Sequence, residues 1–175
     1  MDFAAVTDRK ALEKEVISLK ESKKMTESSM ELLDIGRLWR FFQSPLGRRM
    51  KDAAAKGTLH KEQQFVIGIP AREMEVCDSD ELVLIQGIID AYMEEEDGLV
   101  LVDYKTDRIQ PGQEQVLADR YREQLDYYQR ALEQMTGQCV REKIIYSLTL
   151  HKEINLKQWT AIEGGGKDGE TDEKS

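Results

Sequence analysis

Two aliphatic stretches joined by an Asp-Gly pair constrain the fold of this chain more than any other feature. Residues 82–93 and 99–105 are rich in β-branched and aliphatic side chains, and Asp97 and Gly98 stand between them. An Asp-Gly pair between two such stretches is a strong signal for a β-hairpin, because both residues accept the backbone angles of a tight turn. We therefore expect two antiparallel strands here.

The hairpin carries three charged residues, Asp90, Asp103 and Lys105. A two-residue Asp-Gly loop places Asp90 opposite Lys105, with Asp103 one pair further along. A four-residue loop over residues 95–98 places Asp90 directly opposite Asp103 instead. Because alternate side chains of a strand share one face, either even-length loop leaves the three side chains on the same side of the hairpin.

Two neighbouring carboxylates suggest a metal site. They repel each other, and a divalent cation between them removes the cost of burying them. Oxygen ligands suit Mg²⁺ or Mn²⁺, which makes Asp90 and Asp103 candidate ligands and places Lys105 to steer a water or neutralise phosphate charge. The alternative is a solvated strand face on which an aspartate pairs with Lys105, an interaction worth only ~0–1 kcal/mol.

The rest of the sequence predicts a mixed α/β domain whose helices come first. Helical spacing of apolar residues, with helix start and stop signals, indicates that the first third is helical and that one long helix precedes the last strand. The expected helices are residues 8–24, a second capped at Thr26 and containing Phe42, a third from Ser44-Pro45 to Gly57, and residues 113–135. The expected strands are residues 64–69, the two hairpin strands, and residues 143–150.

Composition narrows the class of protein further. The net charge of −9 is unfavourable for a chain that holds nucleic acid by itself, because phosphate neutralisation supplies most non-specific affinity. Residues 35–61, in which Asp52 is the one acidic residue among several lysines and arginines, are the best candidate for touching a phosphate backbone. No stretch approaches the ~20 apolar residues of a membrane span, and no signal peptide is apparent, so we expect a cytoplasmic protein.

The long helix brings two further polar residues into consideration. Gln124 and Tyr128 are four residues apart and so share a helix face next to Tyr121. Directed at a carboxylate and metal site, they would orient a ligand or a phosphate. The alternative is a helix whose aromatic residues pack on the sheet and whose glutamine faces water.

Three motifs in this order resemble the RecB-like branch of the PD-(D/E)xK nucleases. They are Gly87-Ile-Ile-Asp90 and Val102-Asp-Tyr-Lys-Thr106 on two strands and Gln124-Leu-Asp-Tyr-Tyr128 on a helix. The likeness is greatest to the C-terminal nuclease domain of the larger, AddA-type chain of AddAB-type helicase–nucleases. It implies a restriction-endonuclease-like mixed sheet core in the order α-β-β-β-α-β, with residues 1–57 as a helical lead-in, 58–160 as the nuclease core and 161–175 as an acidic, glycine-rich tail that we expect to be disordered.

The resemblance also implies roles for individual residues. Asp90 and Asp103 match the family's metal-binding acidic residues, the Tyr104 carbonyl matches a backbone ligand, and Lys105 matches the catalytic lysine. Gln124 and Tyr128 match the family's Q-x-x-x-Y motif beside the site and the DNA. Glu62 is similar to the acidic residue that opens the first core strand, although a surface glutamate is an equal alternative.

The implied activity is DNA phosphodiester hydrolysis with Mg²⁺ or Mn²⁺, in a bacterial helicase/exonuclease of double-strand break repair and recombination. The implied partners are DNA, an upstream helicase domain that would bind ATP, and a partner chain of the AddB type. One departure is that the family's further metal-binding histidine has no equivalent, since Gly57-Thr-Leu-His60 echoes its motif only partially; we expect a fragment cut after that histidine. A catalytically degenerate docking module is the alternative, whereas Cas4-like or AddB-like nucleases with an iron–sulfur cluster are disfavoured because the chain has only Cys77 and Cys139.

Overall fold

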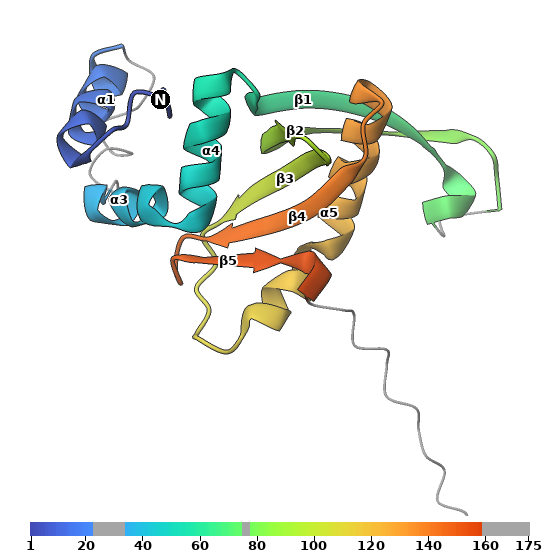
Figure 1. Ribbon diagram of the computed structural model, residues 1–175. Helices are drawn as coiled ribbons and strands as arrows, with labels where there is room; N and C mark the ends of the chain where they lie inside the picture. Colours follow the sequence, from blue (N-terminus) through green and yellow to red (C-terminus); the bar gives the residue numbers. More distant parts are fainter. Residues whose placement is uncertain (23–33, 75–77, 159–175) are drawn as a thin grey trace, which may run out of the picture.

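The centre of the protein is a mixed β-sheet of five strands (Figure 1), seen in a computed structural model that describes residues 1–22, 34–74 and 78–158. The strands lie side by side in chain order, with β3 parallel to β4 and the other neighbouring pairs antiparallel. This arrangement confirms the predicted mixed α/β fold. The strands are β1 (Leu59–Pro70), β2 (Leu82–Glu95), β3 (Gly98–Lys105), β4 (Val140–Ser147) and β5 (Lys152–Asn155).

Helices cover both faces of the sheet (Figure 1). One face packs against α1 (Arg9–Glu21), α3 (Ile35–Gln43) and α4 (Pro45–Lys56), and the opposite face packs against α5 (Glu114–Thr136). Two short 3₁₀ helices, Ala71–Met74 and Leu156–Gln158, follow β1 and β5. Each face therefore has its own apolar core, and the sheet residues alternate between the two.

The helix ends follow the expected sequence signals. The Ser44 side chain accepts the Gly47 N–H at the start of α4, Pro45 occupies the first turn, and Gly57 ends the helix in a left-handed conformation with φ of 76°. Asp34 caps α3 by accepting the N–H groups of Gly36 and Arg37. The expected cap at Thr26 and the tail of residues 161–175 lie outside the described residues.

Two strand predictions were wrong. The first core strand begins at Leu59 rather than at residue 64, and the predicted strand over residues 143–150 ends at Ser147. The chain then turns at His151, whose φ is 52°, and returns as β5, which pairs antiparallel with β4. The sequence of β5 carries little signal because it is four residues long and only Ile154 is buried.

An irregularity interrupts the β1–β2 ladder beside the predicted site. Lys61 pairs with Ala91 and Gln63 with Ile89, but Glu62, with φ of 53°, makes no pair with Asp90. Ala91 belongs to the core under the N-terminal helices, whereas Ile89 belongs to the core under α5. The strands therefore turn over at this point, and Asp90 occupies the position at which the alternation of faces changes.

Candidate functional site

The hairpin register brings the two predicted metal ligands together. Glu94 pairs with Leu99 and Glu95 with Gly98, so the turn consists of Glu96 and Asp97. Continuing this register places Asp90 opposite Asp103. The alternative with Asp97 and Gly98 as the loop is wrong, because Gly98, with φ of 137°, is already paired as the first residue of β3.

Asp103 is buried in the centre of the site. The residue is 2% exposed, and burial raises the pKa of its carboxyl group, an effect that Lys105 opposes and that the charges of Asp90 and Asp107 reinforce. Lys105 Nζ lies 2.8 Å from Asp103 Oδ2, yet this oxygen receives no hydrogen bond of good geometry within the part of the chain that the structure describes. Asp103 is thus a buried anion with an oxygen still able to accept a ligand.

Lys105 lies between the sheet and α5. Besides its ion pair with Asp103, its ammonium donates a hydrogen bond to Gln124 Oε1 at 3.0 Å and lies 4.0 Å from the centre of the Tyr121 ring. The side chain is only 14% exposed. Its charged end is therefore fixed by three neighbours from two elements.

The predicted helix face does point at the site. Lys105 can only donate, so the Gln124 atom that faces it must be the amide oxygen, and the amide nitrogen then donates to Tyr128 Oη at 2.6 Å. The Tyr128 ring packs edge-on against Phe65 at 5.5 Å between centroids. Gly87 permits this contact, because a Cβ there would lie 2.9 Å from the Phe65 ring. The structure thus brings Lys105, Gln124 and Tyr128 together.

Asp90 approaches the site from the ladder irregularity. Its Oδ2 accepts the Tyr104 backbone N–H at 2.9 Å, and its side chain lines an open depression of about 380 Å³ together with Glu62, Tyr104 and the N-terminal residue Met1. The equal alternative left for Glu62 is thereby narrowed, since its carboxylate lies in the same depression as Asp90. Regular alternation along the strands did not reveal this, because it fails at the Glu62 position.

The chemistry of these donors fits a hard divalent cation. Asp90 and Asp103 offer carboxylate oxygens and Tyr104 offers a carbonyl, the ligand types that Mg²⁺ and Mn²⁺ prefer, and the unbonded Asp103 Oδ2 is an oxygen that a cation would satisfy. Within residues 1–22, 34–74 and 78–158, no group of three or more His, Cys, Asp or Glu side chains is placed to hold one ion. A cation here would complete its shell with water and phosphate oxygens.

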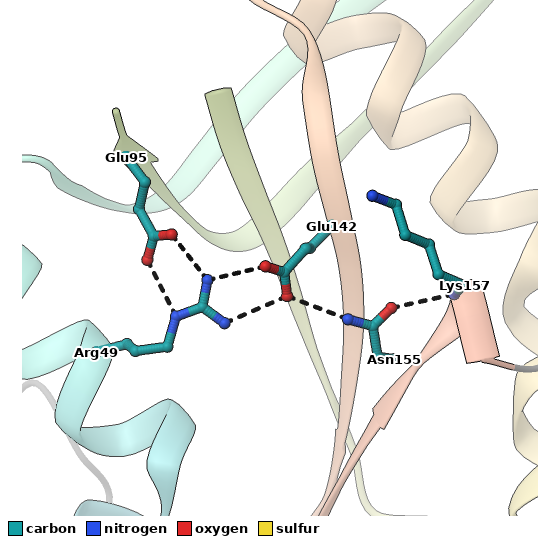
Figure 2. A network of polar contacts seen from close by, with 5 residues as sticks. All are labelled: Arg49, Glu95, Glu142, Asn155 and Lys157. Carbon is teal, nitrogen blue, oxygen red and sulfur yellow. Dashed lines mark hydrogen bonds and ion pairs between the residues drawn. The ribbon is translucent and has the colours of Figure 1, made fainter. Parts of the chain in front are cut away.

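The basic segment predicted to touch phosphate is partly occupied by structural contacts. Figure 2 shows that Arg49 of α4 binds two glutamates at once, Glu95 at 2.8 and 3.0 Å and Glu142 at 3.1 and 3.2 Å, and that Glu142 also accepts from Asn155. His60 pairs with a different carboxylate and stacks on Tyr92, at 4.4 Å between ring centroids. Arg49 therefore fastens α4 to the sheet and is not available for DNA.

Two contributors to the site escaped the sequence interpretation. Asp107, directly after β3, accepts hydrogen bonds from Tyr121 Oη at 2.9 and 3.1 Å and from Arg120 at 2.6 Å. Tyr121 was noted only as a neighbour of Gln124, although its ring lies against Lys105. The Asp-Arg dipeptide after Lys105-Thr106 was the available signal, but a loop aspartate has many possible partners.

Comparisons with known proteins agree with the geometry. The profile described as the PD-(D/E)XK nuclease superfamily matches residues 4–164. The A-type chain of an ATP-dependent helicase/nuclease from Lachnoclostridium phytofermentans is 41% identical over 191 residues, which cover 90% of this chain and 14% of that protein. Proteins of the same name from Acetivibrio thermocellus and Clostridium perfringens are 40% and 33% identical, covering 79% and 90% of this chain but only 11% and 13% of their own lengths. The chain thus spans about a seventh or less of these relatives.

Proposed function

Since this chain belongs to the PD-(D/E)XK nuclease superfamily, we propose that it hydrolyses DNA phosphodiester bonds with a divalent cation, Mg²⁺ or Mn²⁺, held by Asp90 and Asp103. The observation that carries this proposal is Asp103, a buried carboxylate with an unbonded oxygen beside the Lys105 ammonium. A purely structural ion pair would satisfy both of its partners and would not need Asp90 nearby.

Each side chain has a distinct task in this mechanism. Asp90 and Asp103, with the Tyr104 carbonyl, hold the cation, which supplies Lewis-acid polarisation of the scissile phosphate when bound. Lys105 provides a fixed positive charge close to the reacting phosphate, where charge develops during attack by water. Gln124 and Tyr128 hold the Lys105 ammonium in place and present polar groups toward the DNA.

The setting of this activity is also a proposal. The relatives are named as A-type chains of an ATP-dependent helicase/nuclease, so we infer that the chain acts as the nuclease domain of such a protein, with an upstream helicase domain, an AddB-type partner and exonuclease activity in bacterial DNA repair and recombination. We assign the nuclease core to residues 58–160 and the lead-in to residues 1–57. Within the described residues, no helix is long and apolar enough to cross a membrane, and we propose a cytoplasmic location.

Calorimetric titration with Mn²⁺ tests the metal site. We expect the chain to bind Mn²⁺ and expect Asp90→Asn and Asp103→Asn each to weaken binding by at least about tenfold, because each removes a ligand. The matched control is Asp97→Asn, which makes the same change at the exposed hairpin turn and should leave binding unchanged. Absence of binding, or binding that Asp103→Asn does not alter, would instead favour a degenerate docking module.

A further inference from the structure

We propose that Tyr121, held by Asp107, is a positioning residue that fixes the Lys105 ammonium at the cleavage site. The inference rests on the proposed function, because it concerns the lysine assigned to the reacting phosphate. The residues form a chain of contacts, in which Asp107 binds the Tyr121 hydroxyl and the Tyr121 ring faces the Lys105 ammonium.

The contacts of Lys105 show why a third neighbour is needed. Asp103 and Gln124 lie 2.8 and 3.0 Å from Nζ, but a lysine side chain has a flexible four-carbon stem and moves readily between acceptors. The Tyr121 ring, 4.0 Å from Nζ, closes a further direction with its negatively polarised face. The ammonium is then confined between β3 and α5, and its position no longer depends on hydrogen bonds alone.

Asp107 in turn fixes the ring. Burial opposes ionisation of this carboxyl, but hydrogen bonds from Tyr121 and Arg120 outweigh that effect and lower its pKa, so Asp107 is charged at neutral pH. Both of its oxygens accept from Tyr121 Oη, at 3.1 and 2.9 Å. A phenol that donates to a carboxylate gains electron density in its ring, which strengthens the attraction for a cation.

The same helix provides an internal comparison. Tyr127 also lies partly buried against the core under α5, and its hydroxyl donates to the Glu123 carboxylate at 3.0 Å. It thus has the same chemistry as Tyr121, but no lysine contact is found for it in the described part of the chain. The two tyrosines therefore separate the effect of facing Lys105 from the effect of packing on the sheet.

Nuclear magnetic resonance of the lysine side chains tests the contact without requiring activity. Ring currents should shift the Lys105 ε-methylene resonance upfield, and Lys105→Met identifies the resonance by removing it. We expect Tyr121→Leu to abolish the shift, Tyr121→Phe to retain it, and Asp107→Asn to reduce it while leaving the amide spectrum folded. Tyr127→Leu is the control and should leave the resonance in place.

A cleavage assay with Mn²⁺ on linear DNA supplies the second readout. Tyr121→Leu should lower kcat about tenfold with little change in KM, and Tyr121→Phe should restore most of the loss. An unshifted wild-type Lys105 resonance, or one that Tyr121→Leu leaves unmoved, would overturn the positioning role. Unimpaired cleavage by Lys105→Met would overturn the proposed function instead, while the resonance would still decide whether Tyr121 holds the lysine.

Discussion

Removing one member of the Asp103 and Lys105 pair should not equal removing the other. In Lys105→Met, the Asp103 carboxylate stays buried with no cation beside it. In Asp103→Asn, the charge that burial disfavours is gone, and Lys105 keeps Gln124 and the Tyr121 ring. We therefore expect Lys105→Met to destabilise the fold and Asp103→Asn to be nearly neutral or stabilising at pH 8.

The size of the effect follows from burial. The side chains of Asp103 and Lys105 are 3% and 14% exposed, which places the pair in the buried class, where loss of one partner costs about 3–5 kcal/mol. Because Lys105 retains some solvent contact, we take the low end, about 3 kcal/mol. For a chain of this size, 1 kcal/mol shifts Tm by about 2–4 °C, so Lys105→Met should lower Tm by about 6–12 °C at pH 8.

The pH dependence gives the sign. The folded-state pKa of Asp103 is already raised by burial, and loss of Lys105 raises it further. A raised carboxyl pKa means that the folded protein binds more protons than the unfolded chain, so stability falls as the pH rises above the ordinary aspartate range toward the raised pKa. The deficit of Lys105→Met should therefore be smaller at pH 5 than at pH 8.

Thermal unfolding followed by circular dichroism at both pH values measures this difference, with each variant compared with the wild type at the same pH. The reasoning would be refuted if Asp103→Asn lowered Tm more than Lys105→Met. It would also be refuted if the Tm deficit of Lys105→Met were equal at pH 5 and pH 8.

Three further predictions concern the frame around the site. Arg49→Met leaves Glu95 and Glu142 without their shared cation and should cost about 1–2 kcal/mol, seen as a lower Tm that 1 M salt partly restores. Burial and nearby arginines lower the pKa of His151, so the folded protein binds fewer protons than the unfolded chain; stability should fall as the pH drops below about 6.5, and His151→Asn should flatten that fall in melts at pH 7 and pH 5. Gly47→Ala would place a Cβ 2.0 Å from a backbone oxygen of α3 and should destabilise the fold by about 3 kcal/mol or more, measurable by urea unfolding.

Local signals predicted the parts of the fold that depend on local chemistry. Ser44, Pro45 and Gly57 determine the ends of α4 through hydrogen bonding and backbone angles that neighbouring residues alone decide. The spacing of Gln124 and Tyr128 likewise fixes their common helix face, and the structure places that face against Lys105. These features needed no knowledge of the tertiary structure.

The remaining features depend on contacts distant in sequence. Turn length could not be chosen from Asp97-Gly98 alone, because Gly98 packs within 2.6 Å, measured from an ideal Cβ, of the Cys139 carbonyl, which belongs to the segment before β4. The turnover of β1 and β2 depends on the left-handed backbone of Glu62, which nothing in its own sequence favours. Likewise, the role of Asp107 appears only when α5 brings Tyr121 beside it.

Metal-dependent cleavage of DNA at the Asp90, Asp103 and Lys105 cluster is the central claim, and the most direct measurement is release of nucleotides from linear DNA by the purified chain. We predict release with Mg²⁺ or Mn²⁺, none with EDTA, and loss of release in Asp103→Asn despite its intact fold. Release that persists in EDTA, or that Asp103→Asn supports as well as the wild type, would contradict the account.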